Sequence, residues 1–97
     1  MDVLFAPSAR VQFLHAIETI QRNNRAAARK FRLKAGSALK RLARYPHSGA
    51  AVLEFPELPY REIYVKPYRF FYRVGADVVW VVAVWLGAQA PDDPEAP

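Results

Sequence analysis

The sequence contains no cysteine and only two histidines, His15 and His47. Without cysteine, the chain has no disulfide framework, no thiolate nucleophile and no cysteine-ligated zinc site. The Gly-rich phosphate loop, the GxSxG elbow and the HExxH zinc helix are also missing from the sequence. We therefore expect neither a metal nor a cofactor. The absence of cysteine agrees with a reducing cytoplasm, which is the expected location.

Long apolar segments are missing as well. The uncharged run over residues 78–90 is shorter than the about 20 residues that a membrane helix needs, so no membrane contact is expected. The first residues, MDVLF, lack the basic start and the apolar stretch of a signal peptide. A chain of 97 residues, 53% of them hydrophobic, has the size and composition of one small globular domain. We predict a single domain over residues 1–89 and a disordered, acidic, proline-rich tail over residues 90–97.

Positive charge is concentrated in the first half of the chain. Residues 1–50 hold ten Lys and Arg against two acids (+8), whereas residues 51–97 hold four against seven (−3). Nine basic residues and no acid lie between Arg22 and Arg44. Such a segment is typical of a surface that meets a polyanion or an acidic protein, but a solvated helix face has the same composition. Charge alone leaves both interpretations open.

Hydrophobic periodicity predicts two helices after a short first strand. Residues 2–6 are apolar and β-prone, and Pro7 fits the first turn of a helix that runs to about residue 23. A second helix is predicted over residues 25–43, because its apolar residues fall within one arc and most of its basic residues outside it. Two amphipathic helices with a very short joint form an αα-hairpin.

The second half predicts strands. Residues 50–59 contain two prolines and suggest a loop or an irregular edge segment. Strands are predicted over residues 60–65, 68–74 and 78–86, joined by short turns as in an antiparallel meander. The last strand is almost entirely apolar, as expected of a strand covered on both faces. The fold class is therefore α+β, in the order β-α-α-β-β-β, with the helical hairpin packed on one face of a small, mainly antiparallel sheet.

Basic and aromatic residues alternate along the middle strand of this meander. Arg69, Phe71 and Arg73 share one face of an extended strand. This pattern is typical of nucleic-acid surfaces, in which guanidinium groups contact phosphates and rings stack on bases. We interpret Phe70, Phe71 and Tyr72 as core residues. For Arg69 both roles stay open, because an arginine between apolar neighbours requires a defined partner.

Four segments together resemble the RelE/ParE toxins of bacterial type II toxin–antitoxin modules. They are LARYPHSG (residues 42–49), YREI (60–63), PYRFFYRV (67–74) and VVAVWLGAQ (81–89), and the resemblance extends over about residues 3–90. It implies two helices packed on a curved antiparallel sheet, with the first strand at an edge. It also implies a small toxin that is neutralised by a cognate antitoxin protein.

The resemblance leaves the target open. ParE-like members inhibit DNA gyrase and are not known as nucleases, whereas RelE-like members cleave mRNA in the ribosomal A site. Arg69 matches the strand arginine that RelE-like nucleases use near the scissile phosphate, and Arg61 matches a basic position on the preceding strand. Both are candidate catalytic phosphate contacts, but neither is a good proton carrier at neutral pH. His47 lies in the turn after the second helix and is not favoured as that carrier.

Position 86 departs from the family pattern. Many relatives carry His before Gly-Ala, whereas this chain has Leu86 there. The missing proton-transfer group and the long helical hairpin favour a ParE-like toxin that blocks DNA gyrase by binding. The alternatives are a RelE-like, metal-independent mRNA interferase and an inactivated member, natural or engineered, that only binds antitoxin. The candidates for the target or antitoxin surface are Arg25, Arg29, Arg32, Lys40, Arg41 and Arg73.

Two substitutions follow from this interpretation. Arg69→Ala is expected to weaken activity and leave the fold intact, whereas a structural arginine would destabilise the domain when removed. Leu86→His is expected to raise toxicity, because imidazole supplies a hydrogen-bonding and proton-transferring group that leucine lacks.

Overall fold

The computed structural model describes residues 1–87. Its elements are strand β1 (Asp2–Phe5), helices α1 (Pro7–Asn23) and α2 (Arg25–Arg44), and strands β2 (Ala50–Ala51), β3 (Arg61–Val65), β4 (Tyr68–Val74) and β5 (Val78–Leu86). The α+β order expected from the sequence is confirmed. The two-residue strand β2 is an addition, in a segment that the sequence assigned to a loop or an irregular edge. The predicted tail, residues 90–97, lies outside the described residues.

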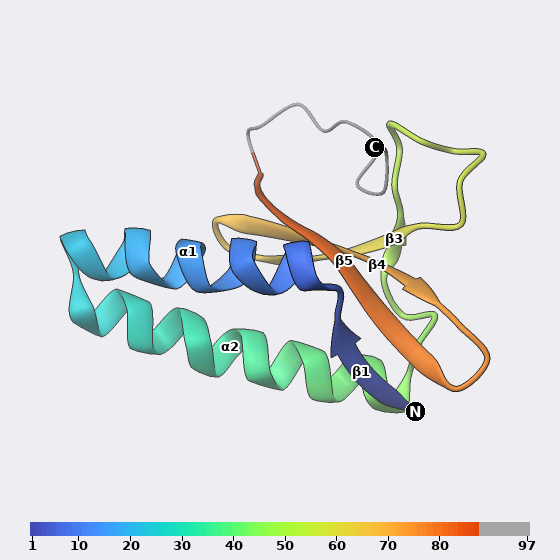
Figure 1. Cartoon of the computed structure of the whole chain (residues 1–97), viewed down its shortest axis with the longest axis horizontal. Coiled ribbons are helices and arrows are strands. Elements are labelled where there is room, and N and C mark those ends of the chain that lie inside the picture. The colour runs from blue at the N-terminus through green and yellow to red at the C-terminus, as the bar shows by residue number, and fades with distance from the viewer. Residues whose placement is uncertain (88–97) are drawn as a thin grey trace.

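The strands form one five-stranded sheet in the order β1-β5-β4-β3-β2. The first strand lies at an edge, as expected, and pairs in parallel with β5. The other neighbours pair antiparallel, which confirms a mainly antiparallel sheet. Figure 1 shows the two helices running side by side on one face of this sheet. The hairpin therefore lies between β1 and the meander in sequence and covers both in space.

Asn24 alone separates the two helices. Its backbone is extended (φ −162°, ψ 110°), and its side chain accepts a hydrogen bond from the N–H of Ala27 at 3.0 Å. Its own N–H donates to the carbonyl of Ile20 at 2.9 Å. One residue thus ends α1 and begins α2 as an N-cap. Neither helix, nor any other within residues 1–87, has the length and apolar character needed to cross a membrane.

Aromatic rings from three elements meet under the hairpin. Phe70 of β4 is fully buried, and its ring centroid lies 5.7 Å from that of Phe13 in α1 and 6.2 Å from that of Phe31 in α2. Alanines such as Ala16 and Ala35 are also buried, so the helices approach the sheet closely. The apolar arcs predicted for both helices therefore form one continuous core with the sheet.

The opposite face of the sheet has a smaller core of its own. Val52 and Tyr60, at the two ends of an irregular segment, are buried against Phe71 of β4 and against β5. Residues 52–60 therefore cover the second face, although they contain no helix or strand. This arrangement confirms that the middle of β5 is covered on both sides.

A β-bulge in β5 adapts the sheet to its two cores. Phe71 lies opposite Ala83, but its neighbour Tyr72 lies opposite Val81, so Val82 is an extra residue in β5. Val82 and Ala83 consequently both belong to the second core, whereas Val81 belongs to the core under the helices. Bulges bend and twist the strand that carries them. The alternation predicted for β4 is unbroken, because the extra residue lies in its partner.

Candidate functional site

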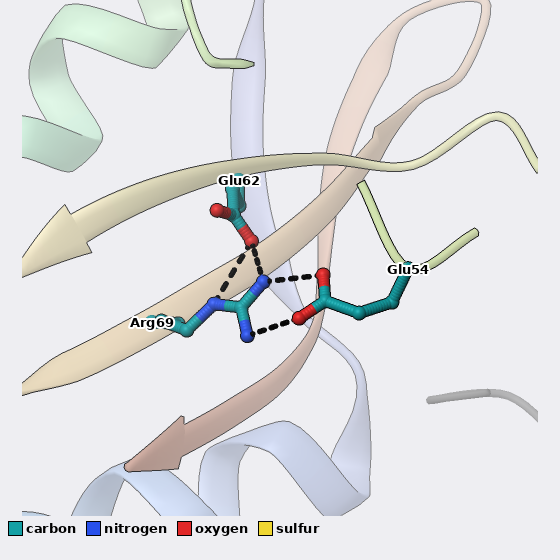
Figure 2. A network of polar contacts seen from close by, with 3 residues as sticks. All are labelled: Glu54, Glu62 and Arg69. Carbon is teal, nitrogen blue, oxygen red and sulfur yellow. Dashed lines mark hydrogen bonds and ion pairs between the residues drawn. The ribbon is translucent and has the colours of Figure 1, made fainter. Parts of the chain in front are cut away.

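Arg69 is held by two carboxylates on the face of the sheet away from the helices. Its Nη1 and Nη2 donate to Oε2 and Oε1 of Glu54 at 3.0 and 2.9 Å, and its Nε donates to Oε2 of Glu62 at 3.0 Å (Figure 2). A further bond joins Nη2 to Glu62. The guanidinium carbon also lies 4.8 Å from the ring centroid of Phe71. An arginine between apolar neighbours requires a defined partner, and the structure supplies two.

The electrostatics of this cluster are those of a closed ion-pair network. The hydrogen bond that Arg69 donates to Glu54 is the main cause that raises the pKa of Arg69 above its ordinary value, with Glu62 adding to it against the effect of burial. In return, the hydrogen bond from Arg69 lowers the pKa of the Glu54 carboxyl. Four hydrogen bonds to carboxylates occupy four of the five N–H donors of the guanidinium. Little of this arginine is left to contact a phosphate unless Glu54 moves away.

Arg61 lies on the other face of the sheet. Residues directly opposite each other in an antiparallel pair point to the same side, and Arg61 lies opposite Tyr72, a member of the core under the helices. Its Nη1 donates to the carbonyl of Gly49 at 2.8 Å. Arg69 stacks on Phe71, which belongs to the second core. The two candidate catalytic arginines therefore point to opposite faces, and the structure does not bring them together.

The turn after α2 is fixed to the sheet by Tyr72. Its hydroxyl donates to the carbonyl of Pro46 at 2.8 Å and accepts from the N–H of Gly49 at 2.9 Å. Burial is the main cause that raises the pKa of this phenol. A Cβ on Gly49 would lie 2.5 Å from the hydroxyl oxygen and 2.7 Å from a backbone carbonyl oxygen, so only glycine fits there. His47, in the same turn, is exposed and lines a hollow of about 320 Å³ together with Arg61.

Leu86 is the last residue of β5 and is 47% exposed. It lies opposite Tyr68, which belongs to the core under the helices, so its side chain points to the face away from Arg69. Arg61 shares this face but lies opposite Tyr72, four residues and about 13 Å farther along β4. The position that departs from the family pattern is thus separated from both candidate arginines.

The basic residues proposed as a target or antitoxin surface fall into several groups. Arg25, Arg29 and Arg32 line a hollow of about 320 Å³ on the flank of α2 next to α1. Arg41 lines a hollow of about 440 Å³ between α2 and β3, and Lys40 is exposed. Arg73 lies on β4, on the same face of the sheet as Arg69, and is partly exposed. The six residues do not form one continuous patch.

Glu54 and Glu62 are the residues of this site that sequence reasoning missed. Strand pairing gives a signal for Glu62, because the predicted meander places β3 beside β4 with acidic and basic residues on the same face. The sequence has no such signal for Glu54, since it lies in the irregular segment before β3. Within residues 1–87, no group of three or more His, Asp or Glu is arranged to hold a metal ion.

The fold and the sequence together define a small toxin of the RelE/ParE class. Residues 3–91 match the family model of the ParE toxin of type II toxin–antitoxin systems (parDE), and the chain belongs to this family. It is therefore the toxin component of a type II module, and its partner is a cognate antitoxin. A search of curated proteins gives no match to the chain.

Proposed function

We propose that this toxin acts as a ParE-like inhibitor that binds and blocks DNA gyrase and does not cleave RNA. The proposal takes residues 1–89 as one toxin domain. Gyrase is a cytoplasmic enzyme, so the proposed site of action is the cytoplasm.

The observation that carries the proposal is the state of the two candidate catalytic arginines. Arg69 is bound by Glu54 and Glu62, and Arg61 points to the opposite face of the sheet. Cleavage of RNA without a metal needs charge stabilisation at one phosphate together with a proton donor and a proton acceptor. Two arginines on opposite faces do not surround one phosphate. This arrangement supports binding as the mode of action.

The proton-transfer requirement supports the same conclusion. General acids and bases work best when their pKa lies near the working pH. The pKa of Glu54 is lowered by Arg69, and that of Arg69 is raised by Glu54. Burial raises the pKa of Tyr68 and is also the main cause that raises that of Tyr72. Each of these shifts leads away from neutrality, as expected of groups with a structural role.

The test compares two assays on the same purified chain. We expect the toxin to inhibit supercoiling of relaxed plasmid by purified gyrase, and the cognate antitoxin to restore it. In a reconstituted translation reaction, we expect mRNA to stay uncut. Codon-dependent mRNA cleavage with normal supercoiling would show a RelE-like interferase instead. Failure in both assays, with no growth arrest on induction, would show an inactivated member.

A further inference from the structure

We propose that Arg25, Arg29 and Arg32, which we call the arginine ridge, form a contact surface for the phosphate backbone of duplex DNA. The choice of DNA rests on the proposed function, because gyrase holds a DNA duplex while it works. The ridge would add a contact to the nucleic acid beside the toxin's contact with the enzyme.

The ridge is a regular row of cations on α2. Its residues are separated by four and three positions, so all three lie on one side of the helix. They extend over about 10 Å along the helix axis. All three side chains are exposed, and together with Gln21 and Ala28 they line a hollow of about 320 Å³. The row is therefore concave, open and cationic.

No acidic side chain within residues 1–87 forms an ion pair with the ridge. Glu18 lines a neighbouring hollow together with Arg25, but its ion pair is with Arg22, at 3.1 Å. The other ion pairs of the described residues involve Arg69. Helix α2 itself contains eight basic residues and no acid. Its charges repel one another, and a polyanion that binds here gains from the release of its own counterions.

The chemistry of the ridge fits phosphate better than an acidic protein. Protein interfaces depend on apolar anchors at their centre and are depleted in charge there. The hollow has only Ala28 as an apolar member, and the exposed Leu33 of α2 is not part of its lining. Guanidinium groups bind phosphate oxygens through two parallel hydrogen bonds, and DNA interfaces are strongly positive and polar. A row made of arginine alone matches the composition of a DNA interface.

Salt-dependent binding to a fluorescent DNA duplex tests this inference. Each phosphate contact contributes about 0.9 to the slope of log K against log salt concentration. We expect the triple variant Arg25→Gln, Arg29→Gln, Arg32→Gln to lower the wild-type slope by about 2.7. The matched control removes three charges on the other flank, with Lys30→Gln, Lys34→Gln and Lys66→Gln. These lysines line a separate hollow of about 270 Å³, and we expect this variant to keep the wild-type slope.

Three results would overturn the inference. The first is a ridge variant that keeps the wild-type slope, and the second is an equal decrease of the slope in both triple variants. The third is a ridge variant that loses antitoxin binding and retains DNA binding. The last result would identify an acidic protein as the partner.

Supercoiling assays separate this inference from the proposed function. If the toxin inhibits gyrase and the ridge variant does so equally without any change in DNA binding, only the inference fails. If the ridge variant lowers the slope as expected but the toxin leaves gyrase active, only the proposed function fails.

Discussion

The two faces of the sheet are covered by different means. On one face, two long helices bury an aromatic core around Phe70, and no charged residue within residues 1–87 is buried in it. On the other face, residues 52–60 cover Phe71 without regular structure, and the ion pair between Arg69 and Glu54 joins this segment to the sheet. Burial of apolar surface therefore dominates where whole helices pack, with neutral hydrogen bonds such as the one that Gln12 of α1 accepts from the N–H of Val84. The irregular cover is instead attached by charged groups.

Truncation of the neighbouring residues Phe70 and Phe71 tests the difference between the faces and has the largest expected effect. We expect Phe70→Ala to lower the free energy of unfolding by about 4–5 kcal/mol and Phe71→Ala by about 3 kcal/mol. Both rings are buried, but an irregular segment relaxes into a cavity more easily than two packed helices. Urea denaturation measures both values. Equal losses, or a larger loss for Phe71→Ala, would contradict the comparison.

The second prediction concerns the attachment itself. We expect Arg69→Ala to lower the free energy of unfolding by about 2–3 kcal/mol, because it leaves Glu54 and Glu62 without their partner beside Phe71. The sequence instead predicts that this variant loses activity and keeps an intact fold. In the control, the double variant Arg69→Ala, Glu54→Gln recovers part of the loss, since one unpaired charge is removed. A fully stable but inactive Arg69→Ala protein would instead support the phosphate-contact role.

A smaller, pH-dependent effect follows from the lowered pKa of Glu54. Its ordinary pKa is 4.5, and Arg69 lowers it in the folded state. As the pH falls below about 4.5, the Glu54 carboxyl is therefore protonated in the unfolded chain before it is protonated in the folded chain. The stability that the ionised carboxylate contributes is present above this pH and is lost as the pH falls through the lowered pKa of the folded state. Thermal unfolding between neutral and acidic pH should show a weaker pH dependence for Glu54→Gln than for wild type. The matched control is Glu57→Gln, which removes one exposed carboxylate from the same segment and leaves both partners of Arg69 in place.

Leu86→His is expected to have the smallest effect. The family pattern predicts higher toxicity for this variant. The strand pairing does not support that prediction, because the side chain at position 86 points to the face away from Arg69 and lies about 13 Å along the sheet from Arg61. The side chain is 47% exposed, so we expect a change of less than about 1 kcal/mol in stability and no gain in growth arrest. Stronger arrest at equal protein levels would show that the imidazole itself acts on the target.

Much of the fold could be predicted from the sequence because the relevant signals are local. Apolar residues at helical spacing predicted both helices, and the short joint between the helices and the short turns between the last three strands gave the element boundaries to within one or two residues. The long apolar run of β5 predicted a strand covered on both faces. The strand β2 was missed, since two alanines carry no periodic signal and depend on pairing with β3.

The candidate site depended on tertiary structure. The sequence by itself determined that Arg69 lies in a strand beside apolar neighbours and therefore needs a partner, and that the chain belongs among RelE/ParE-like toxins. Only the folded chain decided that Arg69 is paired with Glu62 and with Glu54, fifteen positions earlier, and that Arg61 faces the other way. The physical reason is that strand register and the path of an irregular segment are set by packing across the whole sheet, which no local pattern encodes.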